Sequence, residues 1–354
     1  MTFKRSIYNL YYEWWKNIDK FIFFLIILLF FTGLFFSLVS TSLIASDKLD
    51  TNDYSFFFKH LVFIFLGIII IFTVSSFDQE KLFKFSTVIF LISLIFLILV
   101  PFIGIEVKGS KRWIDLYLLP RFQPIELVKP FLIIFISLVL SSQKYNNIYL
   151  KYLFSFLITL VIASLLAVQP DIGQTLLVFF TWSILIFTSG ISIIILTILF
   201  SSLLVVFLYL IFFVSKFEYI KNRIFSFFDS GTGTHNFQSD KAIDSIISGG
   251  FFGKGIGEGT LKNTVPEAHT DYIISVISEE FGAIIVIGIL FLYLIFSYRV
   301  IRKVNFLNED LYKLILTGCV FLILSQTFIH VGVNIRILPT TGMTLPFLSY
   351  GGSS

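Results

Sequence analysis

The sequence predicts an all-α polytopic membrane protein, and three observations carry this prediction. The mean hydropathy is +0.92. Of the 354 residues, 56% are hydrophobic and only 14% are charged. Apolar runs of about 18 to 25 residues recur along the chain, and each is long enough to cross a hydrocarbon core roughly 30 Å thick. These values exclude a soluble globular domain. The single cysteine, Cys319, excludes an intrachain disulfide and a cysteine metal cluster.

We expect nine spanning helices in this sequence. The first apolar run is too long for the core of a signal peptide, and no small-residue cleavage pattern follows it, so it is read as a retained helix. The expected helices begin near Phe21, Phe56, Phe83, Glu126, Tyr152, Ile172, Ile191, Tyr272 and Leu311.

The charges of the connectors set the expected topology. The N-terminal segment and the short connectors are rich in Lys and Arg, which the positive-inside rule assigns to the cytoplasm. Nine helices then place three longer polar stretches outside, at residues 101–123, 216–270 and 334–354. We therefore expect one integral membrane domain over residues 1–354, with a large extracytoplasmic loop at 216–271 between the seventh and eighth helices.

The outer stretches carry more positive charge than translocated loops usually show. Lys111, Arg112 and Arg336 belong to this surplus. An anionic ligand at the outer surface would explain it, and so would a solvated face balanced by nearby acidic residues. Arg112 stands beside Trp113, a pair typical of the membrane interface, where the indole anchors at headgroup depth and the guanidinium offers two parallel bonds to a phosphate.

Polar residues cluster at the starts of two expected helices. Gln123 and Pro124 precede the fourth helix, and Glu126 and Lys129 lie three residues apart on its first turns, where they can form an ion pair. Glu126 either complements the helix dipole or has a functional role, and spacing leaves both open. Lys129 lies inside an apolar segment, where an unpaired ammonium would be costly. Asp171 is expected to cap the sixth helix.

The large outer loop contains a short helix and a glycine-rich run. Residues 239–248 are predicted to form an amphipathic helix that lies in the membrane surface and ends at Gly249 and Gly250. The alternating glycines that follow do not form a nucleotide-binding loop, because no strand precedes them and no GK[ST] triplet follows. They allow a tight backbone path close to a ligand or a neighbouring helix. The apolar face comprises Ala242, Ile243, Ile246 and Ile247, and the glycines are Gly253, Gly255, Gly257 and Gly259.

The segment PEAHTDYIISVISEE brings carboxylates to the mouth of an apolar run. Insertion of an Asp at the centre of a membrane helix costs about 3 kcal/mol, and insertion at the interface costs less. The presence of Asp271 at the start of this run therefore requires an explanation. Asp271 either caps the helix or is a catalytic or ligand-binding group, and His269, two residues before it, is a candidate substrate-binding residue. Glu279 and Glu280 lie two turns deeper and must face protein or water. At least one of them is expected to pair with a cation from another helix.

The final segment, ILPTTGMTLPFLSYGGSS, is rich in Pro and Gly and only moderately apolar. It is expected to form a re-entrant or surface-lying loop, which a membrane protein tolerates where protein buries it. Gly351 and Gly352 in this segment are candidate site-supporting residues.

These motifs together resemble those of the SEDS family of shape, elongation, division and sporulation proteins. GSKRWI with FQPIELVK, then QPDIG, NFQSDKAIDSIISGGFFGKGIGEG, PEAHTDYIISVISEEFG and LPTTGMTLPFLSYGGSS stand in the family's order. The last motif is more similar to the division branch than to the elongation branch. Ile125 departs from the family's pattern, which has Ser at this position. The family has ten spanning helices, so a tenth is expected beyond Ser354.

The resemblance implies a function and assigns roles to residues. Family members polymerise lipid II into the glycan strands of peptidoglycan on the outer face of the cytoplasmic membrane. The resemblance implies an essential Asp at Asp271, site residues at Arg112, Trp113, Gln123, Pro124, Glu126 and Lys129, and a class B penicillin-binding protein, a transpeptidase, as partner beside other division proteins. It gives no role to nucleic acid.

The chemistry of that reaction fits the candidate residues. A diphosphate leaves readily, so one general base and positive charge on the leaving group suffice, whereas glycosidases commonly need two carboxylates. Asp271 is then the base, and Arg112, Lys129 and Arg336 are candidate partners of the undecaprenyl diphosphate. Asp271 holding a divalent cation, Mg²⁺ or Mn²⁺, is an alternative role. An inverting displacement needs no covalent intermediate. The alternative functions are a lipid II flippase or transporter and a division scaffold that recruits a transpeptidase.

Overall fold

The computed structural model describes residues 11–41, 55–107, 110–115, 121–143, 147–228, 237–261, 268 and 270–350. Three candidate residues, His269, Gly351 and Gly352, lie outside the described residues. Most of the described chain is helical, and its single sheet is a two-stranded hairpin.

Eight described helices are long and apolar enough to cross a membrane, which confirms a polytopic helical membrane protein. A further apolar helix, α8, has 17 residues and coincides with the expected sixth span. The eight are α2 (Lys20–Thr41), α4 (Ser55–Ser75), α5 (Gln79–Ile103), α6 (Pro124–Ser141), α7 (Ile148–Val168), α9 (Ile193–Phe213), α14 (Ala283–Val304) and α15 (Asp310–Asn334), and α8 spans Ile172–Thr188.

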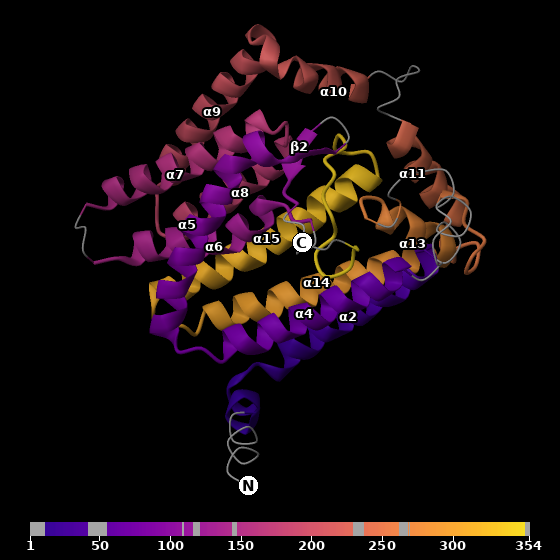
Figure 1. Ribbon diagram of the computed structural model, residues 1–354, viewed down its shortest axis with the longest axis horizontal. Helices are drawn as coiled ribbons and strands as arrows, with labels where there is room; N and C mark the ends of the chain where they lie inside the picture. Colours follow the sequence, from indigo (N-terminus) through magenta and orange to yellow (C-terminus); the bar gives the residue numbers. More distant parts are fainter. Residues whose placement is uncertain are drawn as a thin grey trace.

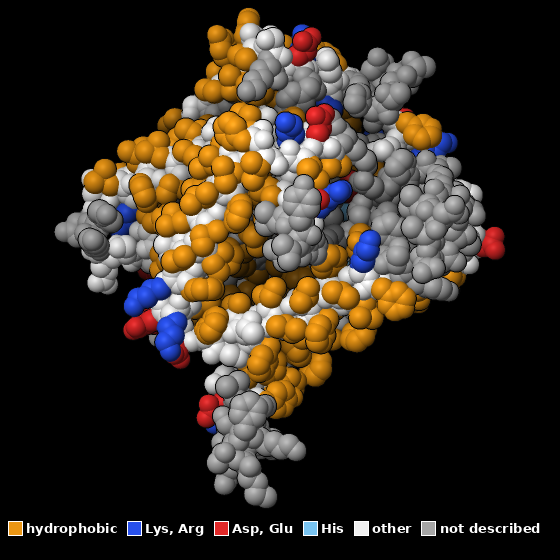
Figure 2. All heavy atoms as spheres, in the orientation of Figure 1, with side chains coloured by type: hydrophobic (Ala, Val, Ile, Leu, Met, Phe, Trp, Pro, Cys, Tyr) orange, Lys and Arg blue, Asp and Glu red, His pale blue; other side chains and the backbone are white. Residues whose placement is uncertain are grey.

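Helix α15 is the centre of the helical bundle. It packs against α6 and α8 on one side and against α14 on the other, while α2 packs against α14 and α4 packs against α2 (Figure 1). Buried aliphatic and aromatic residues of α5, α6, α7 and α8 form the largest core cluster. Hydrophobic side chains also cover the outer faces of the helices (Figure 2), as expected where helices meet lipid.

The expectation of one continuous helix from Tyr272 is wrong. The apolar run divides at Gly282 into α13 (Ile273–Phe281) and α14. Gly282 adopts φ +83°, and a Cβ on it would lie 2.1 Å from the carbonyl oxygen of Phe251. A left-handed backbone and a close chain approach both require glycine here, so the break separates α13 from the spanning helix.

A β-hairpin that the sequence analysis did not predict precedes α6. Strand β1 (Ile105–Val107) pairs antiparallel with β2 (Ser110–Trp113). The backbones of Ile114 and Phe122 then pair once more before α6 begins. Arg112 and Trp113 therefore project from a strand of fixed direction at the end of the bundle.

A helix is present at the predicted position, as α11 (Phe237–Gly249). Ile247, expected on the apolar face, is 72% exposed. Small residues line the face on which α11 packs against α13. That face comprises Ser239, Ala242, Ser245 and Gly249. The predicted position of this helix in the membrane surface stays a prediction.

Glu279 organises the glycine-rich run. Its Oε1 accepts hydrogen bonds from the Lys254 ammonium at 3.0 Å and the Thr260 amide at 2.9 Å, and its Oε2 accepts one from the Leu261 amide at 2.9 Å. Burial acts to raise the pKa of Glu279, but these hydrogen bonds outweigh it and hold the pKa below its usual value. The predicted cation partner of a glutamate exists, although it comes from the loop rather than from another helix.

Candidate functional site

A cavity of about 1020 Å³ lies between the hairpin, the first turns of α6 and α8, helix α4 and the final segment, residues 337–350. Asp271, Arg112, Trp113, Gln123 and Glu126 all line it. The cavity thus brings together five of the candidate residues, from three separate motifs.

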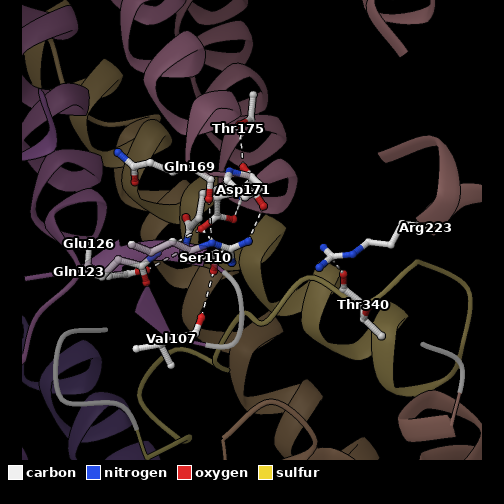
Figure 3. A network of polar contacts seen from close by, with 12 residues as sticks. Val107, Ser110, Gln123, Glu126, Gln169, Asp171, Thr175, Arg223 and Thr340 are labelled. Carbon is white, nitrogen blue, oxygen red and sulfur yellow. Dashed lines mark hydrogen bonds and ion pairs between the residues drawn. The ribbon is translucent and has the colours of Figure 1, made fainter. Parts of the chain in front are cut away.

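Arg112 is held by the connector between α7 and α8. Its Nε donates to the carbonyl oxygen of Gln169 at 3.1 Å, Nη2 donates to the carbonyl oxygen of Pro170, and Nη1 lies 3.4 Å from Oδ2 of Asp171. Figure 3 shows polar contacts around this connector, with Gln169 and Asp171 labelled. The guanidinium thereby joins the hairpin to the start of α8, and two of its N–H groups remain for other acceptors.

Asp171 caps α8, as predicted, and has further partners. Its carboxylate accepts from the Gln174 amide at 3.3 Å and from the Gln123 side chain at 3.1 Å. Complete burial raises the pKa of Asp171, and the positive charge of Arg112 opposes this rise. Asp171 is therefore a buried junction that fixes Arg112 and Gln123 relative to α8.

The predicted ion pair in α6 is confirmed. Nζ of Lys129 lies 2.8 Å from Oε2 of Glu126, and Lys129 also donates to the Gln326 side chain of α15 at 3.1 Å. The other oxygen of Glu126 accepts from Gln174 at 2.8 Å. Lys129 is 4% exposed and does not line the cavity, whereas Glu126 does. The lysine thus meets the requirement that a buried ammonium be paired. Its partner Glu126 lines the cavity, so the pair connects the buried lysine to the cavity wall.

Asp271 lies where α13 meets the final segment. A Cβ placed on Gly342 would be 3.7 Å from Oδ2 of Asp271, so the carboxylate lies beside this glycine. Gly342 has φ +68°, a conformation that favours glycine. Burial raises the pKa of the neighbouring Tyr272 to about 12.

Three cations that the sequence analysis missed as site residues also line the cavity: Lys59, Arg121 and Arg223. Lys59 interrupts the apolar run of α4, which is the signal that identifies it. Arg223 lies on α10 (Glu218–Phe228) and donates to the carbonyl oxygen of Thr340 at 3.3 Å (Figure 3). Arg121 pairs with Asp115 at 3.0 Å, and its side chain is largely exposed.

Other predicted site residues lie away from the cavity walls. Arg336 forms an ion pair with Asp240 of α11. Lys111 is exposed on β2, and Glu279 and Glu280 are buried in α13. Pro124 is the first residue of α6 and is buried. None of these five side chains is among the residues that line the cavity.

The part of the chain that the structure describes holds no group of three or more His, Cys, Asp or Glu side chains arranged for a metal ion. Glu126 has its oxygens engaged by Lys129 and Gln174. A divalent cation in this cavity would thus take Asp271 as its protein carboxylate and the remaining ligands from a bound anion or water.

Comparison with known proteins gives full-length relatives. A protein of Wigglesworthia glossinidia brevipalpis named probable peptidoglycan glycosyltransferase FtsW is 34% identical to this chain over 364 residues, which cover 100% of this chain and 92% of that protein. The protein of the same name from Haemophilus influenzae is 31% identical, with coverages of 100% and 92%.

Solved structures share the fold. A chain of a peptidoglycan synthase complex, studied for the structural coordination of polymerization and crosslinking, has a TM-score of 0.78 and 26% identity and covers 95% of this chain and 93% of its own. The rod shape determining protein RodA of Thermus thermophilus has a TM-score of 0.68 and 25% identity, with coverages of 96% and 92%.

The family model of the FtsW, RodA and SpoVE cell cycle proteins matches residues 19–354. This match covers nearly the whole chain and agrees with both the relatives and the RodA-like fold. The chain belongs to the FtsW/RodA/SpoVE family of cell cycle proteins, the SEDS family that its motifs resemble.

Proposed function

We propose that this protein is a peptidoglycan glycosyltransferase that polymerises lipid II into glycan strands during cell division. The observation that supports this most is the convergence, in one cavity, of the Asp271 carboxylate with the cations Lys59, Arg121 and Arg223. The relatives named probable peptidoglycan glycosyltransferase FtsW support the same activity.

In the proposed mechanism Asp271 is the general base. It takes the proton from the 4-hydroxyl of the acceptor sugar while that oxygen attacks the anomeric carbon of the donor. The bond from this carbon to the diphosphate breaks, and the electron pair leaves with the undecaprenyl diphosphate. The new glycosidic bond forms in a single displacement, which converts an α-linked donor into a β-linked product without a covalent intermediate.

The leaving diphosphate is proposed to contact Lys59, Arg121 and Arg223, with the two remaining N–H groups of Arg112. Lys129 acts indirectly, because it holds Glu126 and lies behind the cavity wall. Apolar residues of α4 line the same cavity and suit the first carbons of a lipid chain; they are Phe58, Val62, Phe63 and Leu66. A divalent cation that bridges Asp271 and the diphosphate is the alternative role for that carboxylate.

The proposed orientation places this cavity at the outer face of the cytoplasmic membrane. α8, counted with the eight long helices, gives nine crossings, and the segment between α9 and α14 is then extracytoplasmic. A class B penicillin-binding protein, which crosslinks the strands, is the proposed partner. The likeness to a chain of a peptidoglycan synthase complex supports an assembly of this kind.

The test is glycan polymerisation from labelled lipid II in liposomes, with the cognate transpeptidase present. Wild type should make long strands, and the Asp271→Asn variant should make none while it still binds the partner. Equal activity in both proteins would remove Asp271 from the mechanism. Movement of lipid II between leaflets without strand formation would favour a transporter, and partner binding as the sole activity would favour a scaffold.

A further inference from the structure

Two buried side chains bond the backbone at the proposed catalytic residue. Oγ of Ser349 donates to the carbonyl oxygen of Thr270 at 2.9 Å. Nδ2 of Asn334 donates to the carbonyl oxygen of Asp271 at 3.0 Å. Successive peptide groups are thus each fixed by a side chain from a distant part of the sequence, namely the end of α15 and the final segment.

Asn334 uses all four of its hydrogen-bonding positions. Besides the bond to Asp271, its Nδ2 donates to the carbonyl oxygen of His330 at 2.8 Å. Its Oδ1 accepts from the amide of Ser275 at 3.1 Å and from the hydroxyl of Ser275 at 2.8 Å. The side chain is fully buried. A side-chain amide of this length supplies the two donors and two acceptors that these bonds need. The hydrogen bonds, and not the volume of the side chain, therefore explain why asparagine occupies position 334.

Ser349 joins the peptide group between Thr270 and Asp271 to a turn of the final segment, residues 345–349. Its Oγ accepts from the amide of Leu345 at 2.9 Å while it donates to Thr270. Gly342, which lies beside the carboxylate of Asp271, is three residues before this turn. Ser349 therefore fixes the distance between the catalytic loop and the final segment.

We propose that Asn334 and Ser349 are positioning residues that hold the carboxylate of Asp271 in its reactive direction within the cavity. This rests on the proposed function, in which Asp271 is the general base. A side chain leaves its backbone in a direction set by the peptide groups on either side, and both of these peptide carbonyls are held. A misplacement of about 1 Å at a reacting group can lower a rate roughly 100-fold.

The test measures lipid II polymerisation, with kcat and KM determined separately, for Asn334→Asp and Ser349→Ala. Asn334→Asp keeps the shape but replaces two donors with acceptors opposite two carbonyl oxygens. We expect kcat to fall about 10- to 100-fold in each variant while KM stays within about 2-fold of wild type, because positioning of the base affects the transition state and not binding. Ser349→Thr keeps the hydroxyl and should recover most of kcat.

Matched controls separate positioning from general loss of structure. Ser297→Ala removes a buried hydroxyl whose one partner among the described residues is the carbonyl oxygen of Tyr293 in its own helix, at 2.8 Å. Asn305→Asp makes the same change of amide to carboxylate at the exposed end of α14. Both should retain wild-type kcat. Should Asn334→Asp fail to fold, as judged by thermal unfolding and partner binding, Ser349→Ala and Ser349→Thr carry the test.

The assay includes Asp271→Asn, so that the two hypotheses fail in different ways. If Asp271→Asn is inactive but folded Asn334→Asp and Ser349→Ala keep wild-type kcat, the positioning role is overturned and the proposed function stands. A loss in Ser349→Ala that Ser349→Thr does not recover also overturns it. If Asp271→Asn itself polymerises lipid II at the wild-type rate, the proposed mechanism fails and the positioning role fails with it.

Discussion

Arg112 on the β-hairpin lies 3.4 Å from Asp171, the residue that caps α8, and the two charges hold together elements that are remote in the sequence. We expect Arg112→Ala to destabilise the protein by about 3 to 5 kcal/mol, because it leaves a buried carboxylate without its cation. Thermal unfolding in detergent measures this. Arg121→Ala, which breaks the exposed pair with Asp115, is the control and should cost at most about 1 kcal/mol.

A double substitution tests whether the cost arises from that uncompensated charge. Combined with Arg112→Ala, the change Asp171→Asn removes the buried charge and should restore part of the lost stability, so the two effects should not add. Additive effects would show that Arg112 stabilises the fold through its carbonyl contacts at Gln169 and Pro170 instead.

The buried pair in α6 leads to a second prediction. Lys129→Met leaves Glu126 with Gln174 alone and should lower the stability by about 3 kcal/mol, whereas Lys129→Met with Glu126→Gln should cost less than the single change. Thermal unfolding of the three proteins provides the comparison. A double variant that is less stable than Lys129→Met would contradict the dominance of the unpaired charge.

Glu279 makes the glycine-rich run sensitive to acid. Its pKa is held below the usual glutamate value by hydrogen bonds that outweigh its burial. Such a group contributes stability that is present above its unfolded pKa, about 4.3, and is lost as the pH falls through its lower folded pKa. Hydrogen exchange, corrected for the intrinsic rate, should show the amides of Thr260 and Leu261 losing protection below about pH 4. Glu279→Gln should lose the same protection at neutral pH, and unchanged protection in that variant would contradict the prediction.

The chain break at Gly282 gives a prediction with a sharp control. Gly282→Ala places a Cβ 2.1 Å from the carbonyl oxygen of Phe251 at a φ of +83°, so it should lower the melting temperature strongly or prevent folding. Gly288→Ala, six residues on in α14, meets no atom within 4 Å and should be neutral or stabilising by up to about 1 kcal/mol. Equal melting temperatures for the two variants would contradict the close approach at Gly282.

The sequence predicts the spanning helices well, because long apolar runs have few alternatives in a membrane. It also predicts the Glu126–Lys129 pair and the cap at Asp171, which depend on helical spacing alone. It misses the hairpin, whose strands are too short for a pattern to be visible. It misses the break after α13, because apolar residues continue on both sides of Glu279, Glu280 and Gly282.

The candidate site is predicted in part for a similar reason. Asp271, Arg112 and Glu126 stand out because charges near apolar runs are costly and therefore visible. The contact of Arg112 with the connector before α8 depends on how the hairpin folds back, which no local spacing encodes. Asn334 and Ser349 are ordinary polar residues in the sequence, and their role becomes apparent only when the carbonyl groups they bond are located.

The cavity takes its walls from the hairpin, from α4 and from the final segment, and this has a consequence for biosynthesis. Helices α2 to α14 leave the ribosome before α15 and residues 337–350, so Arg112, Glu126 and Asp271 enter the membrane before the elements that complete their surroundings exist. During that interval the polar groove must be shielded by the insertion machinery or by water. We therefore expect substitutions in the final segment to make the protein accessible to proteases during its synthesis and insertion, and not after folding is complete.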